Sequence, residues 1–265
     1  MSESKLDVES PMASVKVPVV VVVGILAGFL SGLFGVGGGI LIVPGLVLVA
    51  HMDQRMAHGT SLAGVLPIAA SSMVTYWAHD HIDWVVVLFL AIGAVAGAVL
   101  GTKLLHILPH RTLGVAFAVL LLASAARLFI ADSGTGRDNL DLAMALALIV
   151  VGVVTGILAG LLGVGGGIIM VPAMMMIFGI PPVIAKGTSL GVIIPTSIMG
   201  TWRNRTKKNV DFRAAAIVGI AGVLAAIAGG TLSARMSDTL SNVLFAVLLT
   251  IVAVRLLLQL RNEKR

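Results

Sequence analysis

Apolar runs about as long as a lipid bilayer is thick dominate this sequence. A transmembrane helix needs roughly 20 consecutive apolar residues, within a range of about 17–25. Of the 265 residues, 58% are hydrophobic and only 11% are charged, and the mean hydropathy is +1.08. A water-soluble fold could not cover that much apolar surface with so few polar side chains. The sequence therefore predicts an all-α polytopic membrane protein whose solvent is the lipid bilayer.

The two halves of the chain repeat each other at a constant spacing of 128 residues. Residues 24–46 read GILAGFLSGLFGVGGGILIVPGL and residues 152–174 read GVVTGILAGLLGVGGGIIMVPAM, with 13 of 23 positions identical. Such self-similarity predicts two homologous helical repeats. The predicted organisation is a cytoplasmic N-terminal tail (1–16), a first transmembrane repeat (17–130), a polar linker (131–141), a second transmembrane repeat (142–258) and a cytoplasmic C-terminal tail (259–265).

Each repeat divides into five apolar runs, of which the first ends in Gly-Val-Gly-Gly-Gly and the second is short. The short run cannot span a bilayer upright, so we expect a half-helix or a segment that dips to mid-membrane. This division predicts 8–10 transmembrane segments. The runs are 17–34, 40–50, 60–77, 84–104 and 113–130 in the first repeat, and 142–162, 168–178, 188–202, 212–231 and 240–258 in the second.

Basic residues at the segment ends indicate the orientation. The net charge of +6 is interpreted as topology and not as nucleic-acid binding, because the cations gather in loops beside the anionic cytoplasmic leaflet. The densest basic loop, 203–208, and the C-terminal tail are then both cytoplasmic. The equivalent loop of the first repeat, 78–82, has no Lys or Arg, whereas its next loop carries Lys103 and Arg111. This alternation favours inverted repeats; the competing arrangement is a parallel four-plus-four repeat.

The two Gly-Val-Gly-Gly-Gly motifs, at 35–39 and 163–167, are the strongest candidates for a binding site. Consecutive glycines break a helix, and unwound backbone at membrane depth is tolerated only where it is buried or lines a cavity. A half-helix starting there would point free N–H groups and a positive dipole end at a ligand, which favours an anion. The predicted substrate-binding residues are Gly37, Gly38, Gly39, Ile40, Gly165, Gly166, Gly167 and Ile168. Close helix packing is the competing interpretation of glycine-rich sequence, and we assign to it the glycines spaced by four, Gly24, Gly28, Gly32, Gly152, Gly156 and Gly160.

A second matched pair, Gly-Thr-Ser-Leu at 59–62 and at 187–190, adds hydroxyl groups. Thr60, Ser61, Thr188 and Ser189 are predicted donors to the substrate, although a Thr or Ser beside Gly is also typical of a helix N-cap. Lys186 is the only charged residue between Asp141 and Arg203. It is a predicted substrate ligand, and the alternative is that it snorkels to the interface. Prolines at matched positions are predicted hinges; they are Pro44, Pro67, Pro172 and Pro195.

Other kinds of chemistry are poorly represented. No Asp or Glu lies inside an apolar run, so a carboxylate proton relay is not visible. The chain has no cysteine and no metal-spaced His/Glu cluster, and the consecutive methionines 174–176 face different ways on a helix, as packing residues do. We predict no catalytic residues, no metal site, no cofactor and no enzymatic activity.

The doubled motif G-x-x-x-G-x-x-x-G-V-G-G-G-x-x-x-V-P, followed each time by G-T-S-L, resembles the sulfite exporter TauE/SafE family of membrane permeases. The resemblance covers residues 17–258. It implies transport of small sulfur-containing or organic anions such as sulfite, sulfoacetate or related sulfonates. It places the family's glycine-rich segments at 35–39 and 163–167, and its G-T-S segments at 59–61 and 187–189.

Together these features predict a secondary transporter of a small anion in the bacterial cytoplasmic (inner) membrane, with both termini cytoplasmic. Rocking of one repeat against the other would alternate access to a site at the paired broken helices. The partners expected are the anionic substrate, the bilayer and a coupling ion, either proton or sodium. The choice between monomer and homo-oligomer stays open. The alternatives are an anion channel and, less well supported, an intramembrane enzyme or a scaffold for partner helices.

Overall fold

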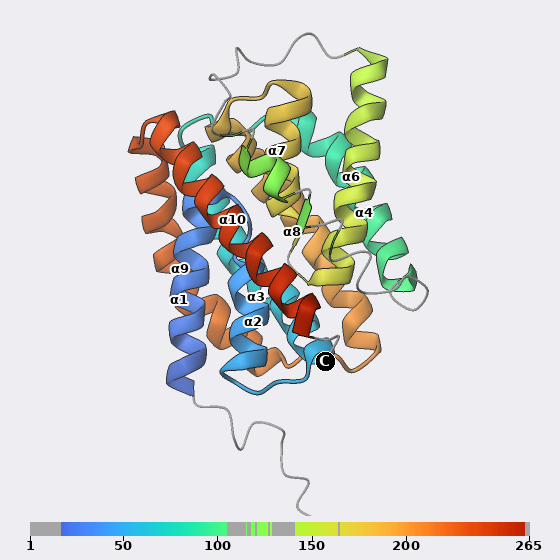
Figure 1. The fold of residues 1–265 in the computed structure, drawn as a ribbon, viewed down its shortest axis with the longest axis vertical. Helices are drawn as coiled ribbons and strands as arrows, with labels where there is room; N and C mark the ends of the chain where they lie inside the picture. Colours follow the sequence, from blue (N-terminus) through green and yellow to red (C-terminus); the bar gives the residue numbers. More distant parts are fainter. Residues whose placement is uncertain are drawn as a thin grey trace, which may run out of the picture.

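The computed structural model describes residues 17–104, 115, 118–119, 121–126, 128, 141–163 and 165–262. Those residues form helices joined by short loops, with no strand among them (Figure 1). The helices are α1 (Val17–Phe34), α2 (Gly39–Leu48), α3 (Gln54–Trp77), α4 (Trp84–Leu104), α6 (Leu142–Leu162), α7 (Gly167–Phe178), α8 (Pro182–Thr206), α9 (Phe212–Arg235) and α10 (Asp238–Asn262). Six of them, α1, α4, α6, α8, α9 and α10, are long and apolar enough to cross a membrane.

The outer surface of the bundle is apolar. Trp202, Ile220 and Leu224 are each at least 70% exposed, and many other large apolar side chains point outward. A soluble protein rarely exposes such continuous apolar surface. The all-α polytopic membrane fold predicted from the sequence is thereby confirmed.

Most helices begin and end where the apolar runs do. The short second run of each repeat is indeed short, 10 residues in α2 and 12 in α7. Several predicted boundaries were wrong. Helices α3 and α8 begin about six residues before Thr60 and Thr188. Helices α8, α9 and α10 end about four residues beyond the predicted run ends at 202, 231 and 258, so α10 extends into the predicted C-terminal tail. The tail at 1–16, the linker at 131–140 and most of the run at 113–130 lie outside the described residues.

Glycines spaced by four hold α1 against α9 and α6 against α4. An added Cβ on Gly28 would lie 2.2 Å from the carbonyl oxygen of Gly222, and one on Gly156 would lie 2.1 Å from that of Ala94. These contacts are equivalent, because both partners shift by 128 residues. The four-residue glycine spacing therefore marks backbone-to-backbone packing, as predicted, and each pair joins a helix of one half to a helix of the other.

The central helices α3 and α8 cross in opposite directions. Gly200 of α8 lies against the side chain of Leu62 of α3. Val65, later in α3, lies near Ile193, earlier in α8, so the two helices run in opposite directions. On its other side, α3 runs parallel to α9, because Thr60 meets Asp211 and Ile68 meets Gly222. Figure 1 shows the resulting bundle, with α1 and α9 at one edge, α4 and α6 at the opposite edge and α10 crossing in front.

The short helix α2 folds back along α1. A Cβ on Gly38 would lie 2.8 Å from the carbonyl oxygen of Ala27, and a Cβ on Gly45 would lie 2.7 Å from the side chain of Val23. Because the later residue of α2 meets the earlier residue of α1, the two helices are antiparallel. Helix α7 likewise returns against α6, where Gly166 lies against Ala159. The glycine motifs are thus the reversal points of two helical hairpins inside the bundle.

Candidate functional site

Each glycine motif adopts a backbone conformation that other residues rarely reach. Gly35, Gly37 and Gly38 have φ values of 67°, 79° and 74°, and Gly163, Gly165 and Gly166 have values of 66°, 80° and 83°. These left-handed conformations cost an L-residue with a side chain roughly 1–2 kcal/mol each. Gly38 and Gly166 are the N-cap residues of α2 and α7, and as glycines they have no side chain to accept from the first-turn N–H groups. The predicted helix breaks are confirmed.

The two glycine turns lie together at the centre of the molecule. A Cβ on Gly37 would lie 3.0 Å from Ile193 and 3.3 Å from Val65, and Gly165 lies beside the same two side chains. A Cβ on Gly167 would lie 2.8 Å from the carbonyl oxygen of Gly35. Helices α2 and α7 therefore begin side by side, next to the crossing of α3 and α8.

Two adjacent helix N-termini make this region electropositive. The first-turn N–H groups of a helix have no intrahelical partner, and the helix dipole places partial positive charge there. Neither α2 nor α7 carries an acidic residue in its first turn. The predicted site residues Gly39, Ile40, Gly167 and Ile168 are all buried in these first turns. The region has the donors needed to hold a small anion.

Thr60 and Thr188 form hydrogen bonds between the two halves of the chain. The Thr60 hydroxyl oxygen accepts a hydrogen bond of 2.9 Å from the Asp211 N–H, and that of Thr188 accepts one of 3.0 Å from the Asp83 N–H. Both threonines are fully buried inside their helices, so the N-cap interpretation is wrong. The caps belong to Asp53 in α3 and, without a side-chain bond, to Pro181 in α8.

Ser61 and Ser189 occupy equivalent positions but differ in their bonding. The Ser189 Oγ lies 2.5 Å from the carbonyl oxygen of Gly35 and 2.7 Å from that of Lys186. Its single proton is therefore shared between two acceptors of its own protein. The Ser61 Oγ is equally buried but has no hydrogen-bond partner among the described residues.

Lys186 is buried, with 1% of its surface exposed, so it does not snorkel to the outside of the bundle. Its ammonium group donates to the hydroxyls of Ser233, at 3.3 Å, and Ser241, and it lies 5.8 Å from the centre of the Phe34 ring. Its backbone packs against Gly35. The equivalent residue, His58, packs against Gly163, and its Nδ1 lies 3.2 Å from the carbonyl oxygen of Leu161.

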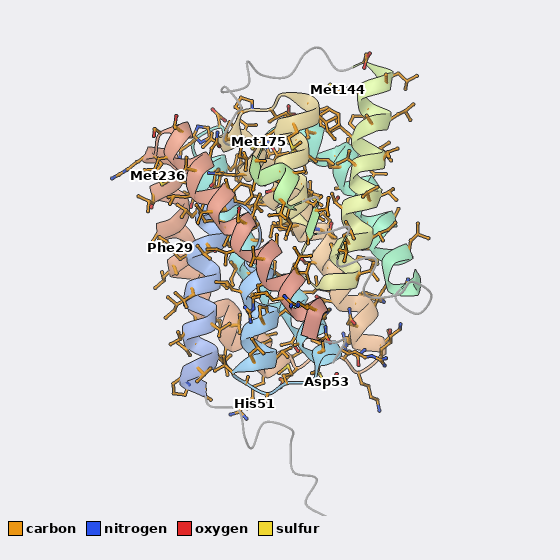
Figure 2. The ribbon with its side chains drawn as sticks, in the orientation of Figure 1. Phe29, His51, Asp53, Met144, Met175 and Met236 are labelled. Carbon is orange, nitrogen blue, oxygen red and sulfur yellow. The ribbon has the colours of Figure 1, made fainter. Side chains whose placement is uncertain are left out.

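The remaining predicted residues are distributed as follows. The four prolines all lie inside helices, Pro44 in α2, Pro67 in α3, Pro172 in α7 and Pro195 in α8. The consecutive methionines face different ways, since Met174 is buried and Met176 is 42% exposed. Figure 2 shows Met175, on α7, near one end of the bundle, whereas His51 and Asp53, in the loop between α2 and α3, lie at the other end.

Sequence reasoning missed several buried hydroxyls. Ser31, Ser72, Ser197 and Thr201 carry buried oxygens that have no hydrogen-bond partner in the described part of the chain. Ser197 matters most, because its Oγ lies 3.9 Å from the position of a Cβ on Gly165. Within the described residues no group of three or more His, Cys, Asp or Glu side chains could hold a metal ion.

Comparison with known proteins agrees with this architecture. Residues 4–140 and 148–265 match the family described as Sulfite exporter TauE/SafE. The chain is 29% identical to the "Probable membrane transporter protein YunE" of Bacillus subtilis, over 92% of this chain and 97% of that protein. It is 32% identical to the "Probable membrane transporter protein MJ0441" of Methanocaldococcus jannaschii, over 69% of this chain and 70% of that protein. The chain is therefore a membrane transporter that belongs to the sulfite exporter TauE/SafE family.

Proposed function

We propose that the chain is a secondary transporter of a small anion, namely sulfite, a sulfonate such as sulfoacetate, or a related organic anion. The observation that carries this proposal is the meeting of two helix N-termini, α2 and α7, at paired glycine turns in the centre of the bundle. Their N–H groups and dipoles favour an anion, and their glycines let backbone approach it. The match to the sulfite exporter family supports sulfur oxyanions as the first substrates to test.

Alternating access around this site is supported by the directions of the helices. Helices α3 and α8 cross antiparallel, and the hairpins α1–α2 and α6–α7 approach the centre from opposite ends of the bundle (Figure 1). We propose that the two repeats are inverted about the central site, as in many secondary transporters. Pro67 and Pro195 lie two residues beyond the Val65–Ile193 crossing and would act as hinges there, with Pro44 and Pro172 doing the same in α2 and α7.

The orientation follows from the basic end of α8. Arg203 and Arg205 lie in its last turn and Lys207 and Lys208 follow, so we place this end in the cytoplasm of a bacterial inner membrane. The C-terminal end of α10 is then cytoplasmic as well. A reporter enzyme active only in the cytoplasm, fused after residue 208 and after residue 265, would be active in both fusions.

Uptake into proteoliposomes tests the function. Labelled sulfite, sulfoacetate and sulfate are offered to wild type, to Gly166→Leu and to a control, Gly64→Ala. Gly166 has φ of 83°, whereas Gly64 lies inside α3, where an added Cβ would lie 3.3 Å from the carbonyl oxygen of Ala215, a tight contact that a shift of a few tenths of an ångström relieves. We expect saturable uptake by wild type and the control, and none by Gly166→Leu.

Two further measurements complete the design. Sulfite should raise the melting temperature of wild type but not of Gly166→Leu, because a ligand stabilises the state that binds it. A pH gradient and a sodium gradient, imposed separately, identify the coupling ion. Absence of flux for every anion by folded, inserted wild type would refute the proposal. Large single-channel currents without counterflow would favour the anion channel.

A further inference from the structure

Two buried serines on α3 and α8 carry hydroxyl groups that the described residues leave unpaired. Ser61 of α3 and Ser197 of α8 are both 0% exposed, and neither Oγ has a hydrogen-bond partner in the part of the chain that the structure describes. A buried hydroxyl without a partner costs about 1–3 kcal/mol. Such a group in a native protein calls for an explanation, and a bound ion or ligand is one of them.

The geometry places both serines at the second glycine turn. The antiparallel crossing of α3 and α8 centres on Val65 and Ile193, and each serine lies four residues, one helical turn, to the same side of it. The Ser197 Oγ lies 3.9 Å from the position of a Cβ on Gly165. Ser61 lies one turn after His58, whose backbone lies against Gly163. Both hydroxyls therefore flank the turn that begins α7.

The first glycine turn lacks this arrangement. The residue 128 positions before Ser197 is Ala69, which has no hydroxyl. The serine equivalent to Ser61 is Ser189, and its proton is shared between the carbonyl oxygens of Gly35 and Lys186. Backbone acceptors thus occupy the hydroxyl equivalent to Ser61 at the start of α2.

We propose that the anion binds off the centre, at the N-terminus of α7, as an oxyanion whose oxygens accept hydrogen bonds from Ser61 and Ser197. This inference rests on the proposed function and adds to it the position and the chemistry of the site. The first-turn N–H groups of α7 supply charge stabilisation, and the two hydroxyls supply directed donors. A sulfite or sulfonate group offers oxygens in several directions, whereas a halide offers no separate acceptor for each hydroxyl.

Thr201 extends the same polar stripe. It lies one turn beyond Ser197 on α8, and its buried Oγ1 also has no hydrogen-bond partner within the described ranges. The stripe leads from the α7 turn towards the basic end of α8. It gives the oxyanion a sequence of donors between the site and that end of the bundle.

The test compares the KM of sulfite uptake among serine variants. We expect Ser61→Ala and Ser197→Ala each to raise the KM by about 10- to 100-fold, the range for a lost hydrogen bond to a charged group. Neither variant should lower the melting temperature, because the empty protein loses no hydrogen bond. Ser72→Ala is the matched control, since it removes another unpartnered buried hydroxyl of α3, 11 residues from Ser61.

A transplant variant tests the asymmetry. Ala69→Ser combined with Ser197→Ala moves the hydroxyl to the equivalent place beside the first turn, and we expect no recovery of the KM. Recovery would overturn the off-centre site, and so would an equal rise in KM for Ser72→Ala. Unchanged KM in Ser61→Ala and Ser197→Ala, with normal wild-type uptake, would refute this inference and leave the proposed function standing. Absence of wild-type uptake would instead refute the proposed function.

Discussion

Matched glycines in the two halves of the chain should differ sharply in their tolerance of alanine. Gly32 and Gly160 are equivalent by the 128-residue shift. A Cβ on Gly32 would lie 2.0 Å from the carbonyl oxygen of Ala226 and 2.6 Å from the backbone nitrogen of Gly230. A Cβ on Gly160 would lie 3.0 Å from the carbonyl oxygen of Ala98. Ordinary contacts begin at 3.4 Å, so the first substitution needs a much larger displacement.

The magnitudes follow from these distances. Gly32→Ala forces α1 and α9 apart by about 1 Å, because both colliding atoms belong to the backbone and cannot rotate away, and a gap of that size forfeits up to about half of each van der Waals contact. Overpacking of this kind costs about 1–3 kcal/mol. Alanine regains about 1 kcal/mol of helix propensity at either position. Because both clashes at Gly32 are with backbone, its overpacking cost lies near the upper end, about 3 kcal/mol, and the net destabilisation expected for Gly32→Ala is about 2 kcal/mol. We expect Gly160→Ala to be nearly neutral.

The assay is the free energy of unfolding in mixed micelles, measured by denaturant titration of the purified variants. Gly28→Ala and Gly156→Ala provide an internal standard, since their closest distances are 2.2 Å and 2.1 Å and their costs should be alike. If Gly160→Ala destabilised the protein as much as Gly32→Ala, backbone contact distance would not be what limits these positions, and the packing argument would be wrong.

Three other substitutions, and a change of pH, should have measurable effects on stability. Thr60→Val and Thr188→Val each leave one N–H of the other half without its partner, so each should lower the free energy of unfolding by about 1–2 kcal/mol, measured by the same titration. Asp211→Ala removes the side-chain cap of α9 and should cost about 1 kcal/mol, visible as a lower denaturant midpoint. Burial, and to a smaller extent the neighbouring His79, lower the pKa of His81 from 6.5. The unfolded chain therefore binds this proton at a higher pH than the folded chain does, and the free energy of unfolding should fall as the pH drops below about 6.5. A His81→Asn variant that kept the same pH dependence would refute this.

The helix breaks and the packing glycines could be predicted from the sequence because both depend on local properties of glycine. Three consecutive glycines interrupt a helix whatever surrounds them, and small residues spaced by four form a groove on any helix. The starts of α3 and α8 were harder to predict. Residues 54–59 include the polar Gln54, Arg55 and His58, so a search for apolar runs excludes them although Asp53 caps the helix that they begin.

The roles of the hydroxyl groups depended on contacts that no local pattern encodes. Thr60 accepts from Asp211, 151 residues away, and Ser189 donates to Gly35, 154 residues away. Ser197 is one of several hydroxyl residues in the run 188–202, and only the register of α3 against α8 places it beside Gly165. The sequence repeat identified equivalent positions, but it did not show which member of each pair has a free donor.

The packing also changes which helices should move together as one body during alternating access. The sequence favoured rocking of one repeat against the other. In the structure, however, backbone-to-backbone glycine contacts join α1 to α9 and α4 to α6, so each tight pair contains one helix from each repeat. Separating the repeats would break both pairs, whereas the α3–α8 crossing meets through side chains such as Leu62, Val65 and Ile193, which can slide and repack. We therefore expect the moving bodies to be two mixed bundles, one built on α1, α3 and α9 and the other on α4, α6 and α8, with the anion site at the seam between them.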